Sequence, residues 1–358
     1  MAHGFVLREE VDTLKDIRKE DEATLKTWLQ SQSAQVFRAK QILHWIWLKG
    51  ADSFDVMSDL SLDLREKLKA HFCFRNARIS LHQQSRDKTI KVAFKLYDGN
   101  VVEGVLIPAG GRMTACVSSQ VGCSLDCKFC ATGYLKRQRN LEAGEIVDQV
   151  RLIGALAKER YGAALSNVVF MGMGEPLLNY QEVVKSIRII TDPEGLGMSS
   201  QRITVSTAGI TKMITRLADE DLGVHLALSL HAANDVQRSA LMPINESNNL
   251  DMLAEALSYF YQKTKNRPTL EYTVMEGVND DAVELLELAA YAKRFPCKVN
   301  LIEYNPIALA DFKPTSENKL DKFAQGLKSK GIIVNVRRSR GKDIDAACGQ
   351  LANKLNDA

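Results

Sequence analysis

Residues 113–130 read Met-Thr-Ala-Cys-Val-Ser-Ser-Gln-Val-Gly-Cys-Ser-Leu-Asp-Cys-Lys-Phe-Cys, a short apolar run followed by three closely spaced cysteines. Cys123, Cys127 and Cys130 have the spacing C-x3-C-x2-C, so one loop can direct three thiolates at a single metal centre. Soft sulfur ligands favour iron–sulfur clusters or zinc over hard cations. A closed structural site uses four protein ligands, whereas this loop supplies three. The spacing therefore predicts an iron–sulfur cluster with one iron left open for another ligand.

Zinc is the alternative metal for this loop. A zinc site completed by Cys116 or Cys348 would also have four cysteine ligands, and three-cysteine sites with a distant fourth ligand do occur. The local spacing favours the cluster over zinc.

Outward from this loop, short apolar runs alternate with segments of helical period. We expect strands at 113–118, 167–171, 202–206, 224–230, 270–275, 298–304 and 332–336. We expect helices near 142–160, 180–191, 209–218, 249–262, 280–294 and 317–329. Repeated strand–helix units imply a parallel sheet with helices outside it. Six or seven such units predict an α/β fold, a partial (β/α)6-type barrel related to the TIM barrel.

The pattern divides the chain into four parts. Residues 1–75 read as a small helical accessory domain that holds all three tryptophans, and we interpret these as anchors of its core. Residues 76–112 read as a β-hairpin extension, with the turn at Asp98-Gly99-Asn100. The partial barrel covers 113–340, and residues 341–358 form a tail.

Bulk properties indicate an ordinary globular protein. The chain has 358 residues, 45% hydrophobic and 25% charged, with a formal net charge of +3 that neither demands nor excludes nucleic acid. No apolar run approaches the roughly 20 residues that span a bilayer, so we expect no membrane association. Seven cysteines without an export signal indicate a reducing compartment. We therefore expect a cytoplasmic protein and a monomer.

Polar residues gather where the expected strands end. In parallel barrels the reactive groups lie at the carboxyl ends of strands. The residues at or just after these ends include the cluster cysteines and Gly174, Glu175, Ser206, Ser229, Leu230, His231 and Asn305, with Cys348 on the tail after the last strand. The strand pattern therefore predicts that they open on one common site.

Each of these residues also has a structural interpretation. Glycine-rich turns are common, strand-end serines can satisfy the backbone, and a histidine in an apolar run is more often a hydrogen-bonded core residue. Glu103 lies in an expected strand, where the pattern alone favours an outward-facing carboxylate. Cys348 follows the basic run 337–342, and positive neighbours lower the pKa of a thiol, so we expect a reactive thiolate there.

Four segments together resemble one family. The runs 115–123, 127–133, 171–176 and 345–351 are similar to those of the RlmN and Cfr family of radical S-adenosylmethionine (SAM) RNA methyltransferases. The likeness covers nearly the whole chain, with no departure at the motif positions. It implies a 4Fe–4S cluster on Cys123, Cys127 and Cys130, and two SAM molecules per turnover. RlmN-type enzymes methylate carbon 2 of an adenosine in 23S rRNA and, in many bacteria, one in the tRNA anticodon loop.

The resemblance also implies roles for individual residues. Cys348 would be methylated by one SAM, and a second SAM on the open iron would be cleaved to a 5′-deoxyadenosyl radical. That radical would take hydrogen from the methyl on Cys348, and the resulting carbon radical would add to the adenine. Cys116 would then attack the sulfur of Cys348, leaving a transient disulfide, and Glu103 would remove the adenine proton. SAM contacts would fall on Gly174, Glu175, Ser206, Ser229, Leu230, His231 and Asn305.

Partners follow less directly from the sequence. The family implies 23S rRNA, tRNA and an electron donor such as flavodoxin or ferredoxin. Two basic runs, 136–139 and 337–342, flank the expected site as phosphate contacts would, although a charge run is usually a solvated face. The alternatives are a carbon-8 methyltransferase of the Cfr resistance type, a radical SAM enzyme on a non-RNA substrate that does not use Cys348, and a zinc-dependent RNA-binding module.

Overall fold

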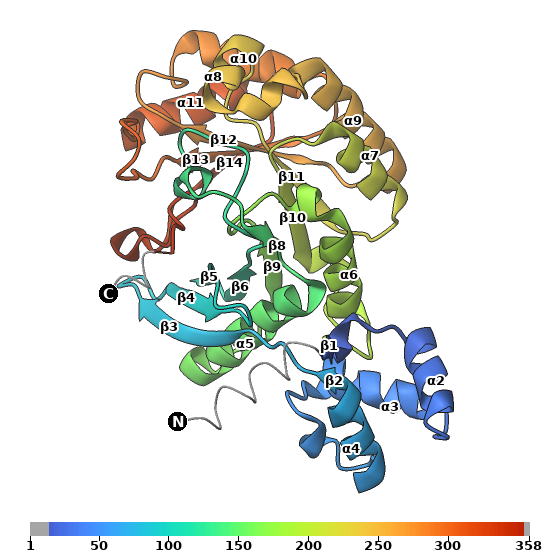
Figure 1. Ribbon diagram of the computed structural model, residues 1–358. Helices are drawn as coiled ribbons and strands as arrows, with labels where there is room; N and C mark the ends of the chain where they lie inside the picture. The colour runs from blue at the N-terminus through green and yellow to red at the C-terminus, as the bar shows by residue number, and fades with distance from the viewer. Residues whose placement is uncertain (1–13, 354–358) are drawn as a thin grey trace. The chain divides into compact units, whose positions relative to one another are not determined.

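One sheet of ten strands organises the larger of two units in the computed structural model, which describes residues 14–353 (Figure 1). The strand order is β14-β13-β12-β11-β10-β9-β6-β5-β4-β3. The seven strands from β6 to β14 are parallel and follow chain order: β6 (Arg112–Cys116), β9 (Asn167–Phe170), β10 (Ile203–Thr207), β11 (His225–Ser229), β12 (Thr269–Val274), β13 (Lys298–Glu303) and β14 (Val334–Arg337). The predicted parallel sheet is confirmed.

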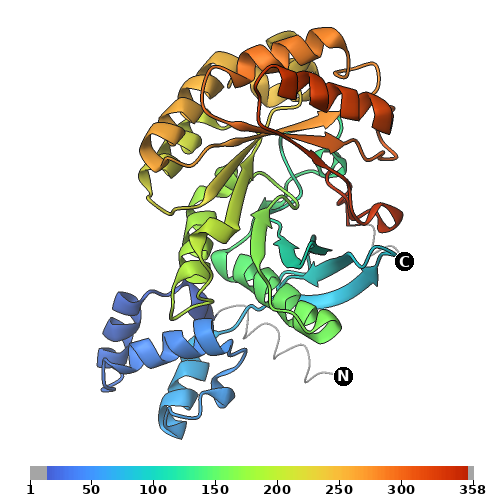
Figure 2. The same ribbon diagram turned by 180° about the vertical axis from the view of Figure 1, so that it is seen from behind.

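Helices connect these parallel strands and lie outside the curved sheet (Figures 1 and 2). They are α5 (Ala143–Tyr161), α6 (Tyr180–Thr191), α7 (Thr211–Asp219), α8 (Asp235–Leu241), α9 (Leu250–Thr264), α10 (Ala282–Ala292) and α11 (Glu317–Ser329). The six predicted helices are confirmed, and the short α8 was not predicted. Because all seven strands are parallel, their carboxyl ends share one edge of the sheet, where the connecting loops meet.

The predicted β-hairpin extension is also confirmed. β4 (Ile90–Lys95) and β5 (Val101–Ala109) pair antiparallel, and β5 pairs antiparallel with β6, so the hairpin continues the main sheet. The edge strand β3 (Arg78–Gln84) was not predicted, because most of its residues are polar and exposed. A separate small ladder joins β7 (Gln120–Val121) to β8 (Arg139–Asn140).

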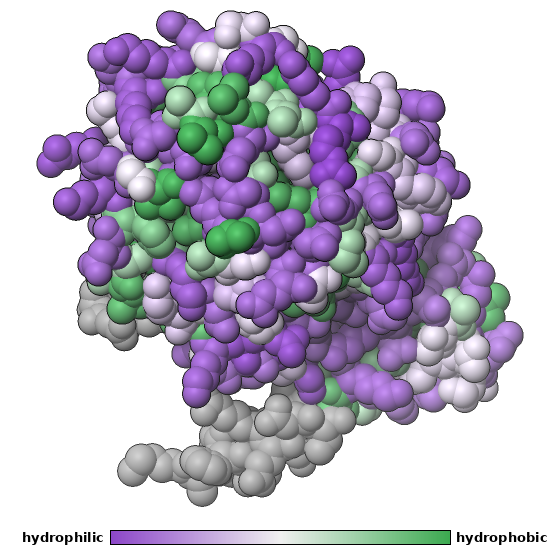
Figure 3. All heavy atoms as spheres, turned by 90° about the horizontal axis from the view of Figure 1, so that it is seen from above, coloured by the Kyte–Doolittle hydropathy of each residue, from purple (hydrophilic) through white to green (hydrophobic). Residues whose placement is uncertain are grey.

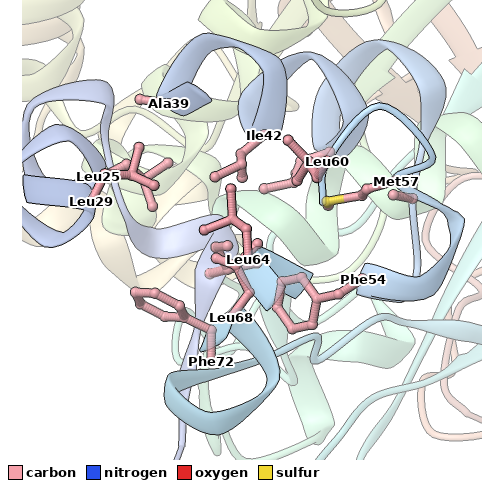
Figure 4. Close-up of a cluster of buried hydrophobic side chains, with 13 residues drawn as sticks. Leu25, Leu29, Ala39, Ile42, Phe54, Met57, Leu60, Leu64, Leu68 and Phe72 are labelled. Carbon is pink, nitrogen blue, oxygen red and sulfur yellow. The ribbon is translucent and has the colours of Figure 1, made fainter. Parts of the chain in front are cut away.

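Of the described residues, the smaller unit comprises 14–77 together with 188–198. Its described elements are β1 (Lys15–Asp16), α2 (Glu22–Ser31), α3 (Arg38–His44), the π-helix Trp45–Lys49, α4 (Leu62–His71) and β2 (Phe72–Cys73). Its core consists of aliphatic and phenylalanine side chains (Figure 4). The three tryptophans pack against this core while staying partly exposed, so the interpretation of them as its anchors is wrong.

Short 3-10 helices complete the described elements. They are Ile17–Lys19, Phe54–Val56, Ala131–Tyr134, Pro176–Asn179, Ser200–Arg202, Pro243–Glu246 and Lys342–Ile344. The domain boundaries predicted from sequence stay a prediction; residues 1–13 of the first domain and 354–358 of the tail lie outside the described residues.

Hydrophilic side chains predominate on the face seen in Figure 3, and hydrophobic ones are interspersed among them. Within residues 14–353, every helix is too short or too polar to cross a bilayer.

Gly104, in the middle of β5, lets three elements pack closely. A Cβ at this position would lie 2.9 Å from the carbonyl oxygen of Cys116 and 2.9 Å from Cε2 of Phe94. Gly154 in α5 is different, because the nearest atom to an added Cβ, on Leu165, would be 3.8 Å away.

We expect Gly104→Ala to lower the free energy of unfolding by about 1–3 kcal/mol, the usual cost of overpacking. Gly154→Ala should raise it by up to about 1 kcal/mol, since alanine is the better helix former and the space is available. Urea denaturation of the full chain measures both. Equal stability of the two variants would show that the close approach at Gly104 is not a packing constraint.

Candidate active site

A cavity of about 230 Å³ opens at the carboxyl edge of the parallel strands. Loops after several strands form its wall, and the C-terminal segment, residues 341–353, returns to it beside β4 and β5 (Figures 1 and 2). The residues predicted from sequence that line it are Cys116, Cys123, Cys127, Cys130, Gly174, Glu175, Ser206, Ser229, His231 and Cys348. The structure therefore brings together residues that lie more than 200 positions apart in the chain.

Three predicted residues do not line this cavity. Leu230 is fully buried in the core, and its backbone carbonyl accepts a hydrogen bond from Arg238. Asn305 lies behind the wall, where its Nδ2 donates to the carbonyl of Cys348 at 3.2 Å. Glu103 is also buried away from the cavity surface. Leu230 and Asn305 thus contact the wall rather than form it.

The cysteine loop is held by its own backbone. The N–H of Cys123 donates to the carbonyl of Leu135 at 3.1 Å, and the N–H of Cys130 donates to that of Cys127 at 3.2 Å. Gly122 has a φ of 76°, and a Cβ there would lie 2.3 Å from the carbonyl oxygen of Lys136. Only glycine suits this turn, because the backbone is left-handed and a neighbouring strand passes close by.

The three cysteine thiols are surrounded by apolar side chains. They pack against a cluster that includes Leu125 and Phe129. Burial raises the pKa of the Cys123 thiol to about 11 and raises the pKa of Cys127 and Cys130 as well. Such thiols ionise readily only when a cation binds them, because a metal ligand must be a thiolate.

This donor set fits an iron–sulfur cluster. In the described residues, no three histidine, cysteine or carboxylate side chains are placed to hold a single metal ion. A 4Fe–4S cluster makes a different demand, since each cysteine binds a different iron and the sulfurs stand further apart. Three thiols on one cavity wall therefore suit a cluster whose fourth iron faces the cavity.

Glu175 presents a second anionic group beside the cysteines. Its Oε2 accepts from the N–H of Ala208 at 2.7 Å and its Oε1 from the N–H of Leu177 at 3.0 Å. Burial raises the pKa of this carboxyl to about 7, although both hydrogen bonds oppose the rise. A cationic ligand in the cavity, such as an ammonium group, would favour its ionised form.

The loop that carries Glu175 is fixed by Gln120, a residue that the sequence analysis missed. The Oε1 of Gln120 accepts from the N–H of Glu175 at 2.8 Å. Gly174 has a φ of 92°, and a Cβ there would lie 2.4 Å from Cβ of Gln120. The glycine-rich turn is therefore required by close packing as well as by its backbone conformation.

His231 is neutral and hydrogen-bonded. Its Nδ1 accepts from the N–H of Thr273 at 3.0 Å, which leaves the proton on Nε2. Burial, with a smaller contribution from the nearby Arg238, lowers the pKa of this imidazole to about 3. Its ring packs edge-on against Phe129 of the cysteine loop, with centroids 4.5 Å apart. His231 thus joins a strand end to the cysteine loop.

Cys116 and Cys348 line the same cavity from different parts of the chain. Cys116 is the last residue of β6 and is buried, whereas Cys348 is exposed to the cavity. The two thiols lie within electrostatic range, since charge on Cys348 raises the pKa of Cys116. Both are free thiols, and their shared cavity is the structural basis for any chemistry between them.

The expectation that the basic run lowers the pKa of the Cys348 thiol is wrong. Enclosure by protein raises the pKa of the Cys348 thiol to about 11, although its side chain faces open space in the cavity. The Arg337 guanidinium opposes this rise but does not reverse it. The basic run that the sequence shows is partly neutralised, because Arg337 pairs with buried Glu271 at 3.3 Å.

Two further arginines of these runs also pair within the fold. Arg338 contacts Glu303 at 3.0 Å, and Arg139 contacts Glu145 at 2.7 Å. Arg337, Arg338 and Arg340 line the cavity, whereas the run 136–139 does not. The run 136–139 is therefore less suited than the run 337–342 to contact a ligand in the cavity.

The C-terminal segment is anchored directly after Cys348. The N–H of Ala131 donates to the carbonyl of Gly349 at 2.7 Å, and Thr132 Oγ1 donates to the carbonyl of Leu351 at 2.6 Å. These bonds attach the segment directly to the end of the cysteine loop. The position of Cys348 therefore depends on the loop that carries Cys130.

The expectation that Glu103 faces outward is wrong. Its side chain is fully buried, and its Oε1 lies 2.9 Å from Nζ of the equally buried Lys91. β5 is covered on both faces, by α5 on one side and by the C-terminal segment on the other. The sequence feature that could have indicated this pair is the presence of opposite charges on the two strands of the predicted hairpin.

Arg238 on α8 is another residue that the sequence analysis missed. It is fully buried, and its guanidinium donates to the carbonyls of Ala208 at 2.7 Å, Ser229 at 3.2 Å and Leu230 at 3.2 Å. Burial lowers the pKa of Arg238 to about 10. It joins the ends of β10 and β11, and a short polar helix gave no sequence signal for this role.

Comparison with known proteins agrees with this geometry. Residues 117–289 match the radical SAM superfamily, and residues 15–74 match the family described as the ribosomal RNA large subunit methyltransferase N-terminal domain. A crystal structure described as a radical SAM methyltransferase from Sphaerobacter thermophilus is 40% identical with a TM-score of 0.88. It covers 94% of this chain and 99% of its own.

Named relatives span nearly the whole chain. A protein of Cytophaga hutchinsonii, named "Probable dual-specificity RNA methyltransferase RlmN", is 57% identical over 95% of this chain and 93% of its own length. A protein of the same name from Flavobacterium johnsoniae is 50% identical over 95% of this chain and 97% of its own. On this identity and coverage, the chain belongs to the RlmN family of the radical SAM superfamily.

Proposed function

We propose that this protein is a radical SAM RNA methyltransferase that adds a methyl group to carbon 2 of an adenosine in 23S rRNA and in tRNA. The observation that carries the proposal is the shared cavity: Cys116 and Cys348 line it together with the three cysteines of the loop. The relatives' printed name, a dual-specificity RNA methyltransferase, supports RNA as the substrate and favours RlmN-type chemistry over the carbon-8 alternative. It also supports two kinds of RNA substrate.

The cavity residues suit the cofactors of this family. Cys123, Cys127 and Cys130 would hold a 4Fe–4S cluster, and membership in the radical SAM superfamily supports the cluster over zinc. Gly174, Glu175, Ser206, Ser229 and His231 would form the SAM site. When bound, the cluster and SAM supply a radical that removes a hydrogen atom, chemistry that amino-acid side chains do not provide.

The protein's own residues then carry and release the methyl group. Cys348 would carry it as S-methylcysteine, and the same carbon would become bonded to the adenine. Cys116 would attack the sulfur of Cys348, so that a disulfide forms as the carbon–sulfur bond breaks. The electron pair of that bond stays with the carbon, which takes up a proton to complete the methyl group. Glu103 would take the adenine proton. Arg337 supports the thiolate that must accept the methyl group, since its charge opposes the raised pKa of Cys348.

Partners and location complete the proposal. The match of residues 15–74 to a ribosomal RNA methyltransferase domain supports a role for that part in holding RNA. Arg338 and Arg340 at the cavity are suited to phosphate contacts. The family resemblance supports flavodoxin or ferredoxin as the electron donor and the cytoplasm as the location. The monomeric state stays a prediction.

Nucleoside mass spectrometry of ribosomal RNA and tRNA, from cells with and without the gene, tests the proposal directly. We expect 2-methyladenosine to disappear from both pools when the gene is deleted. Loss from ribosomal RNA alone would remove tRNA from the proposal. Loss of 8-methyladenosine instead would indicate the carbon-8 enzyme, and no change in either nucleoside would contradict RNA methylation.

We expect Cys348→Ala to reduce methylation by more than about a thousandfold, because it removes the covalent carrier. Cys297→Ala is the matched control, since Cys297 is a buried cysteine outside the cavity, and it should retain activity. Iron content should be the same in both variants. Turnover by Cys348→Ala would favour the radical SAM alternative that does not use this cysteine.

Cys116→Ala should stop the reaction one step later. Without the attacking thiol, RNA would stay bonded to Cys348 through the methylene carbon. We expect a ribonuclease-sensitive protein–RNA band on a denaturing gel, and its absence from the Cys116→Ala/Cys348→Ala double variant. Normal release of methylated RNA by Cys116→Ala would show that another group resolves the intermediate.

A further inference from the structure

We propose that Lys91 is a positioning residue for Glu103: its buried ammonium group pairs with the Glu103 carboxylate and holds it on the cavity side of β5. The inference rests on the proposed function, because it concerns the base that removes the adenine proton. Lys91 belongs to no motif of the sequence, and its role follows from its contact with Glu103.

The contact between the two side chains is short and buried. Nζ of Lys91 lies 2.9 Å from Oε1 of Glu103, and the side chains are 1% and 0% exposed. A buried charge is costly unless it is paired, so neither residue would be ionised at this depth without the other. A pair of this kind is weak evidence for stability, since a hydrophobic pair of similar volume is often as stable. A contribution to stability alone therefore does not account for the pair.

The strand register places Glu103 in the same row as the cavity wall. Val105 and Ile107, two and four residues further along β5, line the cavity, and side chains two residues apart share one face of a strand. Gly104 faces the other way, towards Ile153 of α5. Glu103 therefore points to the cavity side of the sheet, although the C-terminal segment now covers it.

The two carboxylate oxygens of Glu103 have different partners. Oε1 contacts the ammonium of Lys91, whereas Oε2 accepts the backbone N–H of Ala352 at 2.9 Å. Ala352 belongs to the segment that carries Cys348, and the next residue, Asn353, donates from Nδ2 to the carbonyl of Val101 at 2.9 Å. Lys91 thus anchors one oxygen to the sheet, and displacement of a single backbone bond would free the other for substrate.

Few other charges face this carboxylate. α5 packs on the opposite face of β5, and the C-terminal segment contributes a backbone N–H to Glu103. The titratable side chains on this face of the neighbouring strands are Lys91 and the exposed Lys95 of β4, and Cys116 and the exposed Arg112 of β6; the C-terminal segment carries Lys342, Asp343, Asp345 and Cys348. Because Lys91 is the cation in contact with Glu103, replacing Lys91 should affect this carboxylate more than replacing any of the other groups.

The chemical consequence concerns one proton transfer. The O–H bond forms at Oε2 of Glu103 as the C–H bond at carbon 2 of the adenine adduct breaks, and the electron pair stays on the ring. A protonated carboxyl cannot perform this step, and burial without a cation favours the protonated form. Lys91 keeps its own proton throughout and acts only through Glu103.

Lys91→Met tests this assignment in single-turnover reactions with RNA from about pH 6 to about pH 9, a range in which a buried carboxyl can titrate. Without the cation the buried carboxyl has no counter-charge, so we expect methylation to fall at low pH and to recover as pH rises. Movement of this low-pH loss by one pH unit means about a tenfold lower rate at a given low pH. We also expect the Cys348–RNA adduct to accumulate at low pH and to be released when the pH is raised.

Companion variants separate positioning from folding. Lys91→Arg keeps the charge, so the low-pH part of its methylation profile should match that of the wild type. Lys91→Gln keeps a hydrogen-bond donor without the charge, so its loss of methylation should begin at a higher pH. Lys91→Met/Glu103→Gln removes both charges, so it should fold even if Lys91→Met alone does not. Its methylation should equal that of Glu103→Gln, because Lys91 acts only through the carboxylate.

Several results would overturn the inference. If Lys91→Met lost methylation equally at every pH and formed no adduct, Lys91 would be only structural. The same would follow if the double variant Lys91→Met/Glu103→Gln methylated RNA less than Glu103→Gln does. A Lys91→Gln profile that matches the wild type would also contradict it. If the wild-type protein itself formed no 2-methyladenosine, the proposed function would fail, which is a separate outcome from failure of this inference alone.

Discussion

The parallel pairing of β6 with β9 is the constraint on which the rest of the site depends. β6 pairs antiparallel with β5 on one side, with Cys116 opposite Val105, and parallel with β9 on the other, with Cys116 opposite Val169. One strand therefore joins the hairpin extension to the barrel. It brings the Lys91–Glu103 pair, the cavity cysteine and the glycine-rich turn after β9 into one neighbourhood, and a register slip would turn each side chain to the wrong face.

Burial opposes ionisation throughout this region, and the protein resolves the conflict differently at each group. Glu103 has a cation, Glu175 has backbone N–H donors, and Arg238 has carbonyl acceptors. At the cysteines of the loop, burial outweighs the backbone hydrogen bonds to Cys123 and Cys130, and it raises the pKa of all three thiols. A bound metal cluster would convert these thiols to thiolates. The charge distribution of the cavity is therefore complete only when its cofactors are bound.

Sequence reasoning succeeded where a pattern is local. The parallel strands and connecting helices follow from hydrophobic period, and the C-x3-C-x2-C loop follows from spacing, because both depend on residues close together in the chain. It failed at Glu103, which alternation alone placed outward. It also missed Lys91 and Arg238, whose partners depend on strand register and on loops 30 residues away. Cys348 was found, but its expected low pKa was wrong because enclosure outweighs the basic run.

The sequence by itself determined the class of fold, the candidate metal ligands and the family resemblance, since each is written in short runs whose meaning does not depend on distant contacts. Tertiary structure alone decided that the C-terminal segment returns to the cysteine loop and covers the hairpin. Hydrogen bonds from Ala131, Thr132 and Ala352 make that arrangement. They join parts of the chain more than 200 residues apart, and no local pattern of hydrophobicity or charge specifies such pairing.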